Sequence, residues 1–252
     1  MKKTFSLLAL LSASALLASP VNAAPAKPTI VLVHGAFADA AGWSAVIPIL
    51  QRDGYHVVAV ENPLQSLDGD VANTKRVVDD QRGPVVLVGH SYGGAVITGA
   101  AAGDPNVKAL VYLAAIVPDA GEPVAAFLDK YPTELAHAQQ LDKAGFVSID
   151  PAKFQQVFAA DLPAAQAAIA AATQKPIAAA AFGASVPVAA WKSIASWYVV
   201  SKQDHALSPD LERFYAKRIG ANTSEVDGSH VAFISHPKEI AAVIEEAAAS
   251  AK

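Results

Sequence analysis

Residues 84–94 read Pro-Val-Val-Leu-Val-Gly-His-Ser-Tyr-Gly-Gly, an apolar run that leads into a serine between glycines. The run at 84–88 has the length and the β-branched content of a buried strand, and the residues after the motif fit a helix. Gly-x-Ser-x-Gly between a strand and a helix is typical of a turn that strains the serine backbone, with Gly89 and Gly93 leaving room where the two elements converge. The alternative is a glycine-rich turn with an incidental serine. The strand and helix context favours presentation of the Ser91 hydroxyl at the carboxyl end of a sheet.

Further apolar runs without polar alternation recur along the chain, separated by stretches that fit helices. Such runs indicate strands buried on both faces, and strands that alternate with helices indicate an α/β fold with a mainly parallel sheet flanked by helices. The predicted strands are 30–33, 57–60, 85–88, 109–113 and 197–200, with a shorter candidate at 223–226. The predicted helices are 43–52, 71–81, 94–102, 209–218 and 238–249.

The interval from 122 to 188 breaks this alternation, because it has no convincing strand. It contains Ala-rich helical segments such as 164–173, interrupted by prolines. Helices inserted between two sheet strands predict a helical cap over one edge of the sheet. A low-complexity linker is the alternative, but the aromatic residues of the interval offer anchors for a core. We therefore expect one domain, 24–252, with a cap at about 122–188.

The first 23 residues have the pattern of a secretory signal peptide. Lys2 and Lys3 precede an apolar run of 13 residues, and Val21-Asn22-Ala23 supplies a small-residue cleavage pattern. A spanning helix needs about 20 apolar residues, so a removable signal is expected and not a membrane anchor. The mature protein is then expected in the periplasm or outside the cell.

Composition and charge exclude several classes of function. The chain has 19 Lys plus Arg against 23 Asp plus Glu. Loss of Lys2 and Lys3 with the signal leaves a net charge of −6, which disfavours nucleic acid and anionic membranes as main partners. The chain has no cysteine, so disulfides and thiolate chemistry are excluded. It also lacks metalloprotease, P-loop and dinucleotide fingerprints, and neither a metal nor a cofactor is predicted.

A serine nucleophile needs a histidine base, which is itself oriented by a carboxylate. After a strand, turn and helix of this kind, the expected order along the chain is serine, acid, histidine. His230 lies in a loop between the last short strand and the final helix, and it is the predicted base. His236 precedes a proline at a helix start and is interpreted as structural, as are His34 and His90.

Two aspartates follow predicted strands and compete for the role of the acid. Asp204 comes directly after the strand 197–200, where its carboxylate can accept the Nδ1 proton of the imidazole and fix the tautomer. Asp119 follows an earlier strand and is the alternative. Asp210 and Asp227 fit a helix start and a turn better. Asp204 is therefore favoured.

Two backbone N–H groups are expected to bind the oxyanion that forms when a serine attacks a carbonyl. One belongs to Tyr92, which follows the nucleophile, and the other to the loop after the first strand. In that loop Phe37 is the first choice as the donor and Ala36 the second.

These blocks, in this order, resemble the α/β-hydrolase superfamily, and the resemblance covers nearly the whole mature sequence. The segments that carry it are 31–37, 86–94 and 228–230. The chain looks most similar to the small esterase branch that includes plant methylesterases and hydroxynitrile lyases. The resemblance implies an α/β-hydrolase fold with a helical cap and a triad of Ser91, Asp204 and His230.

Differences between this chain and related families disfavour some of the reactions known for this fold. Hydroxynitrile lyases of that branch place a catalytic lysine directly after the triad histidine, where this chain has Val231, so cyanohydrin cleavage is disfavoured. Haloalkane dehalogenases and epoxide hydrolases have a similar fold but use an aspartate where this chain has Ser91. Both of those reactions are disfavoured as well.

The sequence thus predicts a serine hydrolase that cleaves small carboxylic esters through an acyl-enzyme. One alternative is a non-catalytic small-molecule binding protein on the same fold. Another is a lyase, carbon–carbon hydrolase or acyltransferase that uses the same triad. Apolar residues in the cap favour a substrate with an apolar acyl or alcohol group. Neither the individual ester nor the oligomeric state can be read from the sequence.

Expression in a secreting bacterial host is expected to yield an exported protein that begins at Ala24. The paired lysines, the short apolar run and the small-residue pattern before this position are what a signal peptidase requires. Intact-mass measurement of the purified protein checks the cleavage site. A mature protein that still carries Met1 would refute processing.

Overall fold

The computed structural model describes residues 27–251, so the predicted signal peptide lies outside the described residues. Six strands form one parallel sheet in the order β2-β1-β3-β4-β8-β9. They are β1 (Thr29–Val33), β2 (Val57–Val60), β3 (Val85–His90), β4 (Val107–Leu113), β8 (Ala195–Ser201) and β9 (Asn222–Val226). The strands β1 and β3 are buried along their whole length, as their uninterrupted apolar runs predict. The predicted parallel α/β sheet is confirmed.

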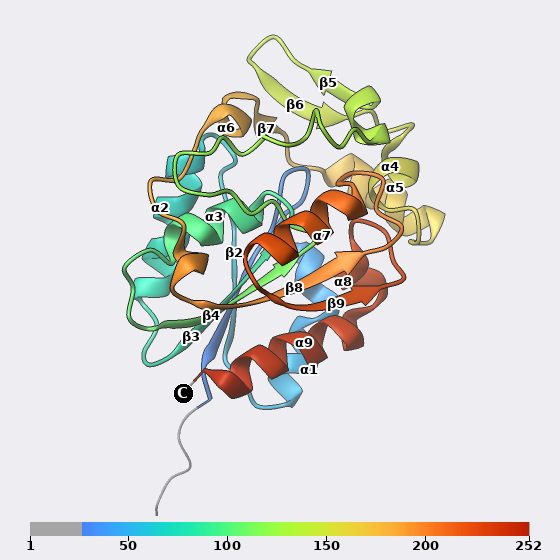
Figure 1. Ribbon diagram of the computed structural model, residues 1–252. Helices are drawn as coiled ribbons and strands as arrows, with labels where there is room; N and C mark the ends of the chain where they lie inside the picture. Colours follow the sequence, from blue (N-terminus) through green and yellow to red (C-terminus); the bar gives the residue numbers. More distant parts are fainter. Residues whose placement is uncertain (1–26, 252) are drawn as a thin grey trace, which may run out of the picture.

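Helices cover both faces of this sheet (Figure 1). On one face α1 (Ile47–Arg52) and α9 (Pro237–Ser250) pack against each other, and on the other face α2 (Leu67–Asp79) packs against α3 (Gly93–Ala100). Two further helices lie outside the inserted segment. They are α7 (Pro209–Arg218), which packs on β8, and the short α8 (Ala232–Ser235), which packs on α9. No helix within residues 27–251 combines the length and apolar character needed to cross a membrane.

The predicted helix at 43–52 is split in the structure. A 3-10 helix, η1 (Ala40–Ala45), comes first and α1 follows it. Pro48 lies in the first turn of α1, where its missing N–H costs nothing and its fixed φ suits the start of a helix. The proline therefore starts a second helix instead of lying inside one continuous helix.

The inserted segment is not purely helical, and that part of the prediction is wrong. A small antiparallel sheet of β5 (Gln139–Leu141), β6 (Phe146–Ile149) and β7 (Ile177–Ala178) lies among short helices. These strands have two to four residues and all three residues of β5 are exposed, so they contain no apolar run that periodicity could detect. The helices of the segment are η2 (Glu134–His137), α4 (Phe154–Phe158), α5 (Ala164–Thr173) and α6 (Ala180–Gly183), followed by η3 (Ala190–Lys192).

This cap gathers at one end of the sheet, at the top of Figure 1, in yellow-green to orange. Its two ends meet in an antiparallel bridge between Pro123 and Ser185. The hairpin between β5 and β6 turns at Asp142, whose carboxylate accepts N–H groups from Ala144 and Phe146. The cap is therefore a compact insertion that leaves and rejoins the sheet domain at neighbouring points.

The turn between β3 and α3 is closely packed. Ser91 has a φ of 54°, in the left-handed region that residues with a side chain rarely adopt. A Cβ on Gly89 would lie 2.6 Å from the Gly93 carbonyl oxygen, and a Cβ on Gly93 would lie 2.6 Å from the Val33 carbonyl oxygen. Only glycine allows these backbones to approach so closely.

Gly89→Ala is expected to lower the Tm by about 5 °C, because overpacking costs about 1–3 kcal/mol and each 1 kcal/mol shifts the Tm by about 2–4 °C at this chain length. The added Cβ would meet backbone atoms that cannot rotate away. Gly183→Ala is the matched control, since a Cβ there has no neighbour within 4 Å. Thermal unfolding followed by circular dichroism compares the two, and equal melting temperatures would contradict the packing argument.

Candidate active site

A cavity under the cap brings together most of the residues predicted for the site. Ser91, His230 and the loop residues Ala36 and Phe37 line it, together with Tyr92. The rest of the lining is largely apolar and comes partly from the cap: Ile116, Leu128, Leu135, Gln139, Phe158, Phe182, Ala206 and Leu207. A more open space of about 440 Å³ shares six of these side chains and leads outward between the cap and the loop after β8.

His230 and Asp204 are joined where β8 and β9 end. His230 Nδ1 lies 2.5 Å from Asp204 Oδ2, and both side chains are buried. Asp204 Oδ1 accepts the backbone N–H groups of Ala206 and Leu207 at 2.6 and 2.8 Å. A carboxylate held in this way accepts a hydrogen bond from the Nδ1–H group of the imidazole, which keeps the proton on Nδ1 and leaves Nε2 free to act as a base.

Asp119, the competing acid, is engaged elsewhere. Its carboxylate forms an ion pair with Lys192 at the surface. The hydrogen bond from this lysine lowers the pKa of Asp119. The structure therefore joins Asp204, and not Asp119, to His230.

The loop after β1 lies directly against the serine. A Cβ on Gly35 would be 2.7 Å from Ser91 Cβ and 2.8 Å from the His90 carbonyl oxygen. Phe37 has a φ of 61°, so the loop turns sharply at the cavity wall. Within the described residues, the backbone N–H groups of Phe37 and Tyr92 donate to no other protein group. Both groups are therefore free to bind an oxygen beside Ser91.

No hydrogen bond joins Ser91 to His230 within the described residues; the two share the cavity lining instead. Such contacts often tighten only when a substrate is bound.

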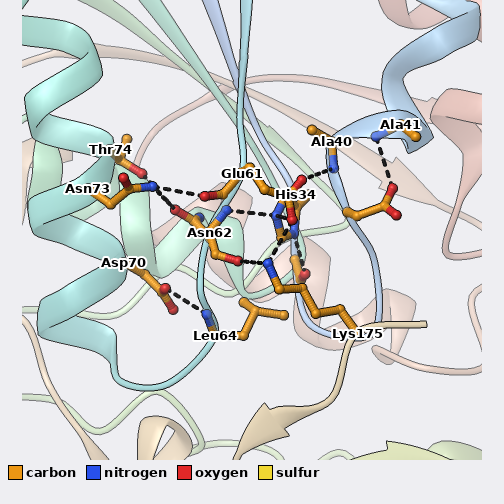
Figure 2. Close-up of polar contacts among 12 residues, drawn as sticks. His34, Ala40, Ala41, Glu61, Asn62, Leu64, Asp70, Asn73, Thr74 and Lys175 are labelled. Carbon is orange, nitrogen blue, oxygen red and sulfur yellow. Dashed lines mark hydrogen bonds and ion pairs between the residues drawn. The ribbon is translucent and has the colours of Figure 1, made fainter. Parts of the chain in front are cut away.

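His34 braces the loop from behind (Figure 2). Its Nε2 accepts the Asn62 N–H at 3.0 Å, so its Nδ1 carries the proton and donates to the Gly35 carbonyl at 2.9 Å. Burial lowers the pKa of His34 and favours this neutral imidazole. The predicted structural role of His34 agrees with these bonds.

His90 supports the histidine loop in a similar way. Its Nε2 lies 2.9 Å from the backbone carbonyl oxygen of His230 and donates to it. The His90 side chain is fully buried, and burial holds its pKa well below the ordinary value. Both ends of the site are thus braced by neutral histidines at the ends of neighbouring strands.

A cap lysine that sequence reasoning missed joins the His34 network (Figure 2). Lys175 Nζ donates to Glu61 Oε1 at 2.7 Å and also to the Asn62 carbonyl. Glu61 Oε2 accepts the Ala40 N–H at 3.0 Å. The cap is thereby tied both to the end of β2 and to the loop that follows β1.

A second cap residue that sequence reasoning missed, Asp161, holds the histidine loop. Its carboxylate accepts the N–H of Ser229 at 2.9 Å, the hydroxyl of Ser229 at 2.5 Å and the hydroxyl of Ser235 at 2.7 Å. Burial alone would raise the pKa of Asp161, but these hydrogen bonds lower it and keep the group charged. Ser229 directly precedes His230. No local pattern marks such a contact, because its partners are 68 residues apart.

Comparison with known proteins shows the family of this chain. The model of the alpha/beta hydrolase family matches residues 30–243. The chain belongs to the alpha/beta hydrolase family. An α-hydroxynitrile lyase and methylesterases of Arabidopsis thaliana are among its relatives, which confirms the branch that the sequence motifs indicated.

The curated relatives are esterases, hydrolases and a lyase of moderate similarity. A carbendazim-hydrolysing esterase of a Nocardioides species is 34% identical over 51% of this chain and 62% of the esterase. The Arabidopsis hydroxynitrile lyase is 34% identical over 42% of this chain and 46% of the lyase. The matches therefore span less than two thirds of the length of these two proteins.

The fold is shared with solved structures across nearly the whole described chain. A pyrethroid hydrolase from Sphingobium faniae superposes with a TM-score of 0.76 at 23% identity. The match covers 88% of this chain and 97% of that structure. At this identity the likeness establishes the fold alone.

Asp161→Asn is expected to loosen the histidine loop, because an amide cannot accept two hydroxyls and an N–H as a carboxylate does. Hydrogen exchange in a peptide that covers 228–236 is expected to accelerate about tenfold, the loss of one hydrogen bond to a charged group. Asp142→Asn is the matched cap control, since that carboxylate bonds only within the cap hairpin. Equal protection of the loop in both variants would show that Asp161 does not hold it.

Proposed function

We propose that the protein is a serine esterase that cleaves small carboxylic esters through an acyl-enzyme. The observation that carries the proposal is that His230 lines the same cavity as Ser91 and is joined at 2.5 Å to the buried Asp204. Membership of the alpha/beta hydrolase family supports the assignment, because esterases are among the relatives of this chain.

In the acylation step the Ser91 hydroxyl attacks the ester carbonyl carbon. His230 Nε2 takes the hydroxyl proton, and the Asp204 carboxylate stabilises the imidazolium that forms. The N–H groups of Phe37 and Tyr92 donate to the negative oxygen of the tetrahedral intermediate. When the intermediate collapses, the bond to the alcohol oxygen breaks and His230 returns the proton to the leaving alcohol.

Deacylation repeats these steps with water as the nucleophile. His230 takes a proton from the water, whose oxygen attacks the acyl carbon, and the same two N–H groups hold the oxyanion. The bond to the serine oxygen then breaks, and Ser91 regains its proton from His230. The carboxylic acid leaves and the site returns to its starting state.

The cavity lining favours an uncharged ester with an apolar arm. In the described part of the chain, the residues that line the cavity include no lysine, arginine, aspartate or glutamate. An anionic substrate would lose its hydration there without a counter-charge. Leu128, Leu135 and Phe182 come from the cap and would contact the arm that extends outward.

A lyase is the second candidate, because a hydroxynitrile lyase is among the relatives. Val231 after His230 disfavours it, since it supplies no cation for a departing cyanide. Aldehyde release from mandelonitrile, assayed beside ester hydrolysis, separates the two reactions.

Ser91→Ala is expected to stay folded and to lose about 10⁴-fold or more in kcat on p-nitrophenyl esters. Asp204→Asn is expected to lose about 10³-fold or more, because the amide would no longer hold the Nδ1–H tautomer of His230. Asp119→Asn is the matched control and is expected to keep activity, since its partner is Lys192.

The assay uses a graded series of p-nitrophenyl esters together with a fluorophosphonate probe. The probe is expected to label the parent protein but not Ser91→Ala, because only an activated serine reacts. A parent protein that binds esters but takes no label would support a non-catalytic binding protein instead. Equal activity losses in Asp119→Asn and Asp204→Asn would contradict the assigned acid.

A further inference from the structure

Glu212 is a fully buried carboxyl group on α7, behind the pair formed by His230 and Asp204. Its side chain is 0% exposed, and its Oε2 accepts the Ser201 N–H at 3.0 Å. Ser201 is the last residue of β8 and opens the turn that Asp204 closes, with the Asp204 N–H 3.3 Å from the Ser201 carbonyl oxygen. Glu212 is therefore fastened to the same strand end that carries Asp204.

The second oxygen of Glu212 has a different environment. Oε1 is buried and receives no hydrogen bond from the donors of the described residues. Asp204 is close enough for its charge to raise the pKa of Glu212. Two ionised carboxylates buried side by side would repel each other and neither could donate, so such a pair is stable only when one of them holds a proton.

The surrounding donors decide which carboxyl group holds this proton. Asp204 already accepts from His230, Ala206 and Leu207, and these three donors stabilise its negative charge. Glu212 has only the Ser201 N–H. Because the donors favour an ionised Asp204, the proton belongs to Glu212.

The other charged and titratable groups nearby leave this arrangement intact. Arg213, the next residue of α7, directs its guanidinium to Glu225 and Asp210 at the surface. Tyr198 of β8 donates its hydroxyl to the Ala115 carbonyl. Tyr215 of α7 is a buried neutral phenol whose pKa is raised by burial. Burial first, and then the Asp204 charge, raise the pKa of Glu212 well above its ordinary value.

We propose that Glu212 is a positioning residue of the catalytic site, whose neutral carboxylic acid donates a hydrogen bond to Asp204 and so orients the carboxylate that holds His230. The proposal rests on the proposed esterase function, because the consequence for activity passes through His230. Glu212 touches no substrate. It links Ser201, the last residue of β8, to α7. It also leaves Asp204 as the single negative charge of the pair.

The protonation of Glu212 makes two quantities depend on pH. As pH rises through the pKa of Glu212 in the folded protein, the donor is lost and a second negative charge appears beside Asp204, so kcat should fall. Stability also falls as pH rises above the unfolded-state pKa, since the unfolded chain releases this proton while the native protein keeps it. A glutamine at position 212 keeps a donor and an acceptor but has no proton to lose.

Glu212→Gln is expected to retain kcat within about threefold of the parent. It is also expected to lack the alkaline loss of activity that ionisation of Glu212 causes in the parent. Glu212→Met, which has neither donor nor acceptor, is expected to lose about 30-fold or more in kcat with little change in KM. The measurements are kcat and KM on a p-nitrophenyl ester between pH 5 and pH 10. A Glu212→Gln variant as impaired as Glu212→Met, with an unchanged pH profile, would overturn the proposal.

Melting temperatures at pH 5 and pH 8 test the same proton without any activity. The Tm advantage of Glu212→Gln over the parent is expected to grow from pH 5 to pH 8. Glu225→Gln is the matched control: this exposed carboxylate pairs with Arg213, which lowers its pKa, so no such growth is expected. A constant Tm difference for Glu212→Gln would mean that Glu212 is ionised and would overturn the proposal even in an active esterase. If the parent has no esterase activity, the proposed function fails while the Tm comparison still decides the location of the proton.

Discussion

The backbone around Ser91 is packed so closely that it has no room for a Cβ on its neighbours. Gly89, Gly93 and Gly35 each lie where an added Cβ would come within 2.7 Å of another atom of this turn or of β1. This contact forces the positive φ of Ser91 and presses the loop after β1 against it. The distances between the serine and the two free N–H groups therefore follow from backbone packing, which is stiffer than any side-chain contact.

The cap does more in this structure than close the cavity. Asp161 reaches the loop of His230, and Lys175 reaches Glu61 and Asn62 behind the loop of Phe37. The two charged anchors thus contact the two loops that supply the base and the oxyanion donors. Changes in the cap can therefore alter the geometry of the reacting groups as well as the choice of substrate.

The electrostatics of the site depend on keeping one charge in a buried cluster. Burial lowers the pKa of His34 and of His90, and burial together with the charge of Asp204 raises the pKa of Glu212, so all three groups are held neutral. Asp204 differs from these three groups because it accepts from three donors, which stabilise its charge. This localised negative charge stabilises the imidazolium that forms when His230 accepts a proton. His230 can therefore act as a general base.

The sequence by itself determined the sheet, the turn at Ser91 and the choice of His230 and Asp204 as partners. Those features are local: an uninterrupted apolar run marks a buried strand, glycines mark a tight turn, and the position of a residue after a strand places it at the sheet edge. The sequence did not predict the strands of the cap, because two to four residues are too short to show a periodicity. Only the tertiary structure decided that Asp161 meets Ser229, that Lys175 meets Glu61, and that Glu212 binds Ser201 at the strand end that precedes Asp204. Such contacts join polar residues from different elements, and their energy comes from mutual burial and hydrogen bonding that exist only after the sheet and the cap have packed together.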